Sequence, residues 1–345
     1  MLTLSKTALK PGLEWVEKPK PVPHKDEVLI KIEYVSVCGT DVHLYEWNDW
    51  AKHRVKKPMT MGHEFVGTIV ECGPDVKHRK PGDLVSAETH IVCGHCEFCL
   101  NDQKHICEHT EVIGVDRDGA FAEYICIPEE NAWLNNPDIP MHLLSVQEPL
   151  GNAVHTLMAQ PIEGKTVAIL GVGPIGILAV DAAKAMGAKT VVAIDVVDYR
   201  LKLAQQIGAD AIIYANKENV DKRIRELCGQ NGVDVICEMS GNTHALKQAF
   251  NYVKAGGHIA ILGIPSQDLS FDVASSIVFK GIHVHGITGR HMFQTWEKVK
   301  DLIDHQKLHL DHVITHVLDW TQIHEAMDLM HSGECGKIVL KVNHD

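Results

Sequence analysis

Four cysteines lie close together in the segment CGHCEFCLNDQKHIC, at Cys93, Cys96, Cys99 and Cys107. Their spacing, C-x2-C-x2-C-x7-C, is typical of a tetrahedral zinc site, because short Cys-x2-Cys steps deliver pairs of thiolates to one ion. An iron–sulfur cluster fits less well, since the bacterial ferredoxin run closes with C-x3-C-P. Disulfides are typical of secreted proteins, and nothing else in the sequence indicates secretion. Four protein ligands leave no position for a substrate, so the spacing predicts a closed, structural zinc site.

A second set of zinc-ligand types consists of Cys38 in CGTDVH and of His63 and Glu64 in GHEFVG. Each of these residues alone is most often an ordinary core residue. Together they offer three protein ligands, and zinc with an open fourth position can bind a hydroxyl oxygen and lower its pKa. Consecutive residues on a strand face opposite ways, so His63 and Glu64 can share one ion only if the chain bends there.

A glycine-rich turn, Gly171-Val-Gly173-Pro-Ile175-Gly176, follows the apolar segment TVAIL and opens a helical segment. In this context the first glycine allows a tight turn, the second admits a pyrophosphate, and the third lets helix and strand pack closely. Asp195 ends the next apolar strand, 19 residues after Gly176. A carboxylate there accepts hydrogen bonds from a ribose diol and repels a 2′-phosphate, which favours NAD over NADP.

Arg200 follows Asp195 by five residues. Its guanidinium can cover the adenine of the dinucleotide or can simply be solvated, and the sequence does not separate these two interpretations.

The elements that must position these residues are of two kinds. The first half is rich in short apolar segments at residues 28–37, 65–73, 83–89 and 120–127, separated by proline and glycine. From Gly164 onward, apolar strands alternate with helical segments, which predicts a doubly wound parallel sheet with right-handed crossovers. The fold class is therefore α/β, with a β-rich domain before the parallel sheet. Helices within TWEKVKDLIDHQ and QIHEAMDLMH and a final strand, GKIVLKV, are also expected.

Composition narrows the class of partner. The 345 residues exceed one ordinary core, and the formal charge of −12 argues against nucleic acid and anionic membranes. The first residues, MLTLSKTALKPG, lack the apolar core of a signal peptide. We expect a cytoplasmic protein that acts on a small molecule.

GHEFVGTIVECGPDV and the cysteine quartet resemble the zinc signature and the structural-zinc loop of the medium-chain alcohol dehydrogenase superfamily. The resemblance extends along the whole chain. It implies a GroES-like catalytic domain at 1–148 that carries both zinc sites, a Rossmann NAD-binding domain at 149–291, and a segment at 292–345 that returns to the catalytic domain. Catalysis would then be the oxidation of an alcohol with hydride transfer to NAD.

The domain junction narrows the substrate. Horse-liver-type alcohol dehydrogenases have a cysteine ligand there, whereas this chain has Glu148 in EPLGNAVHT. Together with CGTDVHLY, EMSG, LGIP and GITGR, this sequence is similar to the bacterial L-threonine 3-dehydrogenases of the superfamily, which implies oxidation of the 3-hydroxyl of L-threonine. A polyol or vicinal-diol dehydrogenase of the sorbitol or 2,3-butanediol type is the nearest alternative. A non-catalytic binding protein of the same fold is a further one, although no zinc ligand is missing.

The resemblance also implies roles for residues of the catalytic domain. Cys38 and His63 would bind the catalytic zinc, with the carboxylates of Glu64 and Glu148 as ligands or as outer neighbours. The other predicted catalytic residues are a proton relay and a histidine on the substrate side of the site: Thr40, His43 and His90. Thr40 is also well suited to cap a helix beginning at DVHLY.

In the Rossmann domain, the resemblance places further backbone beside the cofactor. The residues are Leu262, Gly263, Ile264, Ile287 and Thr288. Arg290 is a candidate partner for an anion, either on the substrate or on the pyrophosphate. A homotetramer with two zinc ions per subunit is the assembly that the resemblance implies.

Overall fold

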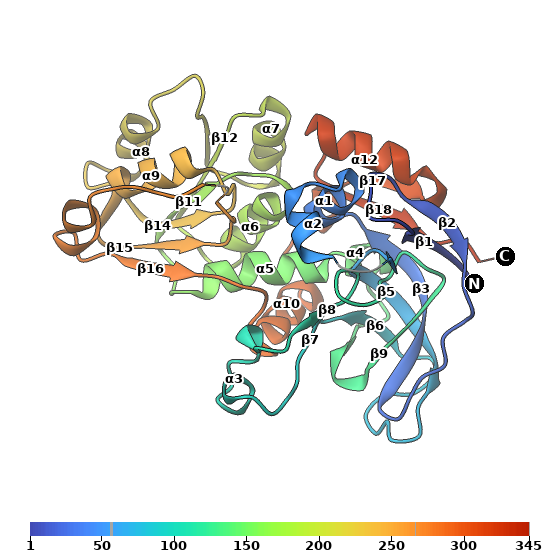
Figure 1. The fold of residues 1–345 in the computed structure, drawn as a ribbon. Helices are drawn as coiled ribbons and strands as arrows, with labels where there is room; N and C mark the ends of the chain where they lie inside the picture. Colours follow the sequence, from blue (N-terminus) through green and yellow to red (C-terminus); the bar gives the residue numbers. More distant parts are fainter. Residues whose placement is uncertain (56–57, 266, 345) are drawn as a thin grey trace. The chain divides into compact units, whose positions relative to one another are not determined.

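The computed structural model describes residues 1–55, 58–265 and 267–344. The chain forms two compact units (Figure 1). The first comprises Met1–Glu148, Ile314–Ser332 and Lys337–Asp345, and the second comprises Pro149–Val313 and Gly333–Gly336. Residues 292–313, which were expected in the returning segment, cluster with the second unit, and the chain returns to the first unit at Ile314.

A seven-stranded sheet dominates the first unit. Its strands follow the order β10-β6-β5-β3-β18-β17, and β9 pairs with β3 off this path. Their bounds are β3 Glu27–Ser36, β5 Glu64–Cys72, β6 Leu84–Ala87, β9 Tyr124–Pro128, β10 Ala132–Leu134, β17 Ile314–Asp319 and β18 Lys337–Lys341. The four apolar segments expected as strands in the first half of the chain all contain strands of this sheet.

The last strand of the chain is built into this sheet, between β3 and the edge strand β17. β18 pairs antiparallel with the end of β3, where Val339 lies opposite Ser36, and parallel with β17. Its apolar side chains are buried, so the returning segment is part of the core and not a surface appendage. This pairing brings the start of β18 next to the end of β3.

Smaller elements complete the first unit. A three-stranded sheet consists of β1 Leu2–Lys6, β2 Glu14–Glu17 and β4 Met59–Thr60, and β7 His90–Ile91 pairs with β8 Glu111–Val112. The helices are α1 Gly39–Glu46, α2 Asp49–Arg54, α3 Glu97–Leu100, α4 Met141–Leu144 and α12 Ile323–Ser332. Helix α5, Gln147–Met158, begins in the first unit and continues in the second.

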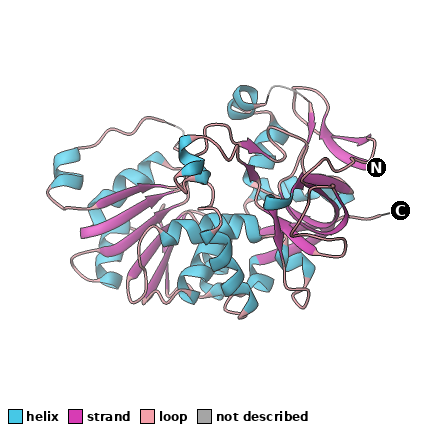
Figure 2. Ribbon diagram, turned by 90° about the horizontal axis from the view of Figure 1, so that it is seen from below, coloured by secondary structure: helices cyan, strands magenta, loops and turns pink. Residues whose placement is uncertain are grey.

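The second unit is built on a six-stranded parallel sheet in the order β13-β12-β11-β14-β15-β16 (Figure 2). The strands are β11 Thr166–Leu170, β12 Thr190–Asp195, β13 Ala211–Tyr214, β14 Val233–Glu238, β15 Val253–Ile261 and β16 His283–Gly286. The chain runs outward from β11 to β13 and then crosses to β14, so the strand order reverses between β11 and β14. Ligands of open α/β sheets bind at the carboxyl ends of the strands at such a switch point.

The helices of this unit are α6 Pro174–Ala185, α7 Asp198–Ile207, α8 Val220–Cys228, α9 Thr243–Tyr252, α10 Gln294–Asp304 and α11 Leu310–Val313. The strand side chains of β11 and β12 are almost all buried, as the near-continuous apolar runs predict for a parallel sheet covered on both faces. Within the described residues, every helix of the protein is too short or too polar to traverse a lipid bilayer.

Candidate metal centres and cofactor site

The four cysteines of the quartet converge on one point. Sγ of Cys93 is 4.0 Å from Sγ of Cys99 and 3.6 Å from Sγ of Cys107, and Sγ of Cys96 is 3.8 Å from Sγ of Cys107. Thiolates bound to one tetrahedral zinc at 2.3 Å are about 3.8 Å apart, whereas disulfide sulfurs are about 2.05 Å apart. The quartet therefore has the dimensions of a single-ion thiolate site.

Backbone amides point at the sulfurs of the quartet. The N–H of Cys96 donates to Sγ of Cys93 at 3.3 Å, and those of Cys93 and His109 donate to Sγ of Cys107 at 3.4 and 3.3 Å. Burial would raise the pKa of the Cys107 thiol, but the N–H groups of Cys93 and His109 and the neighbouring thiols lower it, which favours the thiolate form that binds metal. The backbone of the loop around α3 thus places N–H donors where they stabilise sulfurs that bind a zinc ion.

The second donor set is assembled from two chain segments. Cys38 is the N-cap of α1, and its backbone N–H donates to Oδ2 of Asp41 at 3.0 Å. His63 and Glu64 follow Gly62, whose φ of +85° turns the chain just before β5 begins. His63 lies just outside β5, which begins at Glu64, so the two are not successive residues of one regular strand. One donor atom from each of Cys38, His63 and Glu64 lies within 4.8 Å of the other two.

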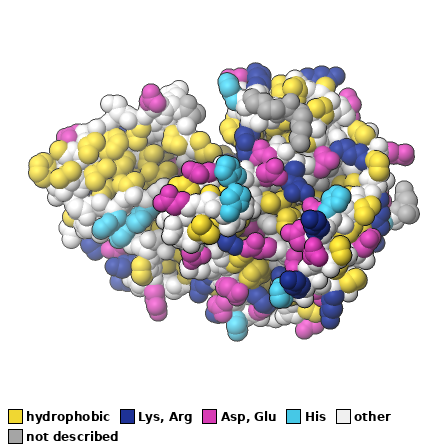
Figure 3. Space-filling model, turned by 60° about the horizontal axis from the view of Figure 1, so that its bottom comes forward, with side chains coloured by type: hydrophobic (Ala, Val, Ile, Leu, Met, Phe, Trp, Pro, Cys, Tyr) yellow, Lys and Arg dark blue, Asp and Glu magenta, His cyan; other side chains and the backbone are white. Residues whose placement is uncertain are grey.

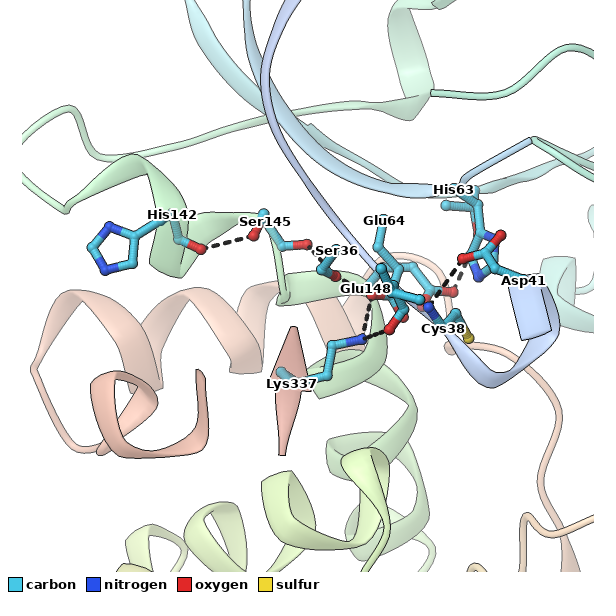
Figure 4. A network of polar contacts seen from close by, with 11 residues as sticks. Ser36, Cys38, Asp41, His63, Glu64, His142, Ser145, Glu148 and Lys337 are labelled. Carbon is cyan, nitrogen blue, oxygen red and sulfur yellow. Dashed lines mark hydrogen bonds and ion pairs between the residues drawn. The ribbon is translucent and has the colours of Figure 1, made fainter. Parts of the chain in front are cut away.

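Three buried polar atoms in and beside this second set have no hydrogen-bond partner among the described residues, and Figure 4 shows the residues that carry them. They are Oδ1 of Asp41, Nδ1 of His63 and Oε1 of Glu64. The side chains are 0–5% exposed, so water does not compensate these atoms. Buried polar atoms normally have partners, and sulfur, imidazole and carboxylate are the donors that zinc takes. The set therefore fits a zinc ion.

The charges of this set are arranged for a cation. Burial alone would lower the pKa of His63, but the neighbouring Cys38, Asp41 and Glu148 raise it to about 10. Burial raises the pKa of Asp41 to about 6, although His63 opposes the shift. The imidazole thus sits among groups that favour positive charge, and Asp41 Oδ1 faces its Nδ1 at 4.0 Å. A carboxylate behind a ligating imidazole is a common way to orient it.

The carboxylates of Glu64 and Glu148, either of which could be a zinc ligand by sequence, differ in their contacts. Oε2 of Glu64 accepts hydrogen bonds from Ser36 Oγ and from Lys337 Nζ, whereas its Oε1 belongs to the unpartnered atoms. Oε1 of Glu148 accepts from Thr89 Oγ1 at 3.2 Å. Glu64, not Glu148, is part of the compact three-donor group.

Thr40 and His43 both lie on α1, three residues apart and hence on one side of the helix. The helix begins at Gly39 with Cys38 as its cap, so the additional prediction that Thr40 caps it is wrong. Thr40 is half-buried and His43 is exposed. Nδ1 of His43 is 2.8 Å from the amide nitrogen of Asn48, whose amide oxygen caps α2.

His90 begins β7, and its backbone N–H donates to Oε1 of the buried Glu88 at 2.8 Å. It directly follows Thr89, which bonds Glu148. The structure thus connects the strand that carries His90 with one of the candidate ligands.

The glycine motif has the expected conformation in the second unit. Gly171 has a φ of +83°, and a Cβ on Gly176 would lie 2.0 Å from the carbonyl oxygen of Gly171. Gly173 caps α6 with open space around it, where a Cβ would meet only Nη1 of Arg200 at 3.9 Å. Ile175 lies in the first turn of α6. The helix N-terminus is therefore accessible to an anion.

Asp195 holds this turn together from the end of β12. Its Oδ2 accepts from the N–H of Val172 at 2.8 Å, and its Oδ1 accepts from those of Val196 and Val197 at 2.7 and 2.9 Å. A cavity of about 580 Å³ opens beside it, lined among others by Gly171, Gly173, Asp195 and Arg200. The cavity lies at the carboxyl ends of the strands and has a size suited to the nucleoside half of a dinucleotide.

Loops after β15 and β16 carry the remaining predicted cofactor residues. The N–H groups of Leu262 and Gly263 donate to the carbonyl of Glu238, and a Cβ on Gly263 would lie 2.3 Å from the backbone nitrogen of Gly241. Ile287, next to Thr288, donates to Ile261, while Ile264 is 82% exposed.

Arg290 is almost completely buried, and its Nη1 donates to Oδ1 of Asn152 at 3.2 Å. Its aliphatic stem packs against Gly151, where a Cβ would lie 2.7 Å from it. These contacts hold the side chain against α5.

Sequence reasoning missed the supporting residues of the second metal set: Ser36, Asp41, Thr89 and Lys337. Asp41 had a local signal, because an acid three residues after a helix cap is typical of a capping box. Lys337 had none, since a lysine at the start of an apolar strand normally reaches solvent.

Comparisons with known proteins agree with this geometry. Residues 24–138 match the alcohol dehydrogenase GroES-like domain, and residues 174–305 match the zinc-binding dehydrogenase model. L-threonine 3-dehydrogenase of Caldanaerobacter subterraneus is 48% identical over 99% of this chain and 98% of that protein.

Among solved structures, a short chain alcohol dehydrogenase from Escherichia coli in complex with NADH is 26% identical, with a TM-score of 0.90 over 99% of each chain. 2R,3R-butanediol dehydrogenase from Bacillus subtilis is 25% identical, with the same TM-score and the same coverage of each chain.

Proposed function

Because the chain belongs to the zinc-binding dehydrogenase family, we propose that it oxidises the 3-hydroxyl of L-threonine to L-2-amino-3-oxobutanoate and transfers the hydride to NAD. The observation that carries this proposal is the buried three-donor set Cys38, His63 and Glu64 with the unpartnered Oε1 of Glu64. The similarity to L-threonine 3-dehydrogenases over nearly the full length of both chains supports the substrate.

In this proposal Cys38, His63 and Glu64 hold the catalytic zinc, and Glu148 stands beside them as a second carboxylate. Zinc supplies a Lewis acid that lowers the pKa of the substrate hydroxyl. Asp41 orients His63 from behind, and Lys337 with Ser36 orients Glu64. The quartet holds a structural zinc and takes no part in the reaction.

Thr40 and His43 carry the hydroxyl proton toward solvent. Support comes from their common side of α1 and from the step from a half-buried hydroxyl to an exposed imidazole. His90 acts on the substrate side of the site. Its contact with Glu88 fixes the strand that bears it.

NAD binds the second unit with its pyrophosphate at the N-terminus of α6 and its ribose at Asp195. The cavity beside Asp195 and the free space around Gly173 support this placement. Hydride transfer requires that the nicotinamide meet the substrate hydroxyl, and the loops at Leu262–Ile264 and at Ile287–Thr288 are the backbone proposed to lie along it.

A cytoplasmic location and a homotetramer belong to the same proposal. The quartet cysteines are thiols, not disulfides, as a reducing compartment favours. Apolar side chains gather on the surface of the second unit (Figure 3). The most exposed large apolar side chains of this unit are Ile264, Val278 and Phe279, which are 82%, 63% and 83% exposed. Such a surface favours contact with another copy.

The test is NADH formation measured at equal concentrations of L-threonine, sorbitol and 2,3-butanediol, together with the zinc content of the protein. We expect threonine to give the highest kcat/KM with two zinc ions per chain. Higher kcat/KM with sorbitol or 2,3-butanediol would refute threonine as the substrate and favour the polyol or vicinal-diol alternative.

Two cysteine variants of the same unit separate catalysis from folding. Cys38→Ser is expected to abolish turnover and to leave one zinc per chain. Cys126→Ser, in β9 and outside both donor sets, is the matched control and is expected to keep both zinc ions and full turnover. Full turnover by Cys38→Ser would show that the catalytic metal has been assigned to the wrong residues.

A further inference from the structure

One buried lysine connects the two chain segments that supply the proposed catalytic ligands. Lys337 is 1% exposed, and its Nζ donates to the carbonyl of Val37 at 2.8 Å and to Oε2 of Glu64 (Figure 4). Val37 directly precedes Cys38. A single ammonium therefore bonds to the backbone next to the sulfur ligand and to the carboxylate ligand.

The two oxygens of Glu64 are treated differently by their surroundings. Ser36 Oγ and Lys337 Nζ both donate to Oε2, while Oε1 has no hydrogen-bond partner among the described residues. A carboxylate held in this way can offer a metal only its Oε1. Its charge is also balanced by the ammonium, and both partners are fully removed from water.

We propose that Lys337 is a positioning residue that limits how strongly Glu64 binds the catalytic metal. By holding Oε2 and offsetting the charge, it keeps the carboxylate a weak, one-oxygen ligand that can withdraw when the substrate hydroxyl needs the position. This inference rests on the proposed function, since it takes Glu64 as a ligand of the catalytic zinc.

The direction in which the rate of zinc release changes when Lys337 is removed separates this role from simple structural support. If Lys337 only held the fold together, its removal would loosen the site and release zinc faster. If it weakens Glu64 as a ligand, removal leaves Ser36 as the remaining donor to Oε2 among the described residues and takes away the ammonium that offsets the carboxylate charge, so zinc is released more slowly. The negative carboxylate attracts the zinc cation more strongly when the neighbouring positive ammonium is removed.

The experiment compares Lys337→Met with the unchanged protein, both loaded with zinc. We expect zinc transfer from the catalytic site to a coloured chelator to be about tenfold slower in Lys337→Met. We also expect kcat to fall with little change in KM. Lys337→Arg, which keeps the charge and the donors, is expected to restore most of both values. Zinc release from the quartet should be unchanged and serves as the internal reference.

Lys6→Met is the matched control. Lys6 is also 1% exposed in the first unit, and its Nζ donates to the carbonyls of Lys10 and Gly12 at 2.6 and 2.9 Å. Its loss should cost stability without changing zinc release. If Lys337→Met does not fold, Ser36→Ala removes the other donor to Oε2 without removing a charge, and a smaller slowing is expected.

Faster or unchanged zinc release in the variant that folds would overturn the proposal. The zinc measurement needs no substrate, so it remains decisive if threonine is not turned over. Failure of threonine oxidation with slower zinc release would refute the proposed substrate and not the role of Lys337.

Discussion

Replacing Asp195 with asparagine tests whether one carboxylate both builds the cofactor turn and selects the cofactor. The carboxylate accepts three backbone hydrogen bonds, two at Oδ1 from Val196 and Val197 and one at Oδ2 from Val172. An amide has only one oxygen. If that oxygen keeps the two bonds at the Oδ1 position, its NH2 group faces the N–H of Val172, and at least one bond to a charged acceptor is lost.

The loss of one such bond costs about 1.5–3 kcal/mol. For a unit of this size, this corresponds to a fall of roughly 3–12 °C in the unfolding temperature. If the ribose diol binds at Asp195 as proposed, the same change weakens its acceptance, so we expect KM for NAD to rise about tenfold. It also removes repulsion of a 2′-phosphate, so the ratio of kcat/KM for NADP to that for NAD should increase.

The assay is thermal unfolding of the protein without cofactor, followed by kcat and KM with NAD and with NADP. Asp198→Asn is the matched control in the same region. Its carboxylate is 52% exposed and bonds Tyr214 and Lys202 at the surface, so a change within about 0.5 kcal/mol is expected. An Asp195→Asn protein with unchanged stability and unchanged cofactor preference would refute the reasoning.

Three further outcomes follow from other sites. Cys96→Ser should lower the zinc content from two ions per chain to one and lower the unfolding temperature, while activity per folded molecule is retained; unchanged zinc content would contradict the quartet assignment. The hydrogen bond to Glu46 raises the pKa of His331. His331→Asn should therefore destabilise the protein below pH 6.5, and this difference in stability should vanish as the pH rises through the higher pKa of the folded state. Unfolding measured at pH 6 and at pH 9 tests this. Gly62→Ala should destabilise by several kcal/mol, because φ is +85° and an aromatic ring lies 2.4 Å from the new Cβ. Gly12→Ala, at a φ of +96° with nothing within 4 Å, measures the backbone part alone, and equal losses in the two variants would exclude the steric part.

The features that the sequence predicted well are those coded within a few neighbouring residues. The quartet spans Cys93–Cys107, and its spacing alone indicates a shared ion. The glycine turn at Gly171–Gly176 needs only its own backbone and the strand before it. The alternation of strands and helices after Gly164 likewise follows from local patterns, which is why the parallel sheet could be predicted.

Other features depend on contacts between distant segments, and no local pattern reports them. Residues 292–313 were expected in the returning segment because their amphipathic helix no longer fits the alternating pattern, but that helix, α10, packs in the second unit. The asymmetry of Glu64 depends on Lys337, 273 residues later in the chain. A lysine in the sequence KIVLK looks like a solvent-facing residue until β18 is placed beside β3.

The proposed catalytic site is assembled from segments at both ends of the chain. Cys38 and His63 belong to segments near the N-terminus, and their donor atoms are close together because β3 and β5 are neighbours. Without β18, Glu64 would lack the ammonium that donates to its Oε2 and offsets its charge, and a buried carboxylate with less compensation is costly in a folded protein. The last strand therefore lowers the cost of holding Glu64 ionised inside the first unit. The return of the chain to its first unit thus supports the proposed metal site as well as the sheet.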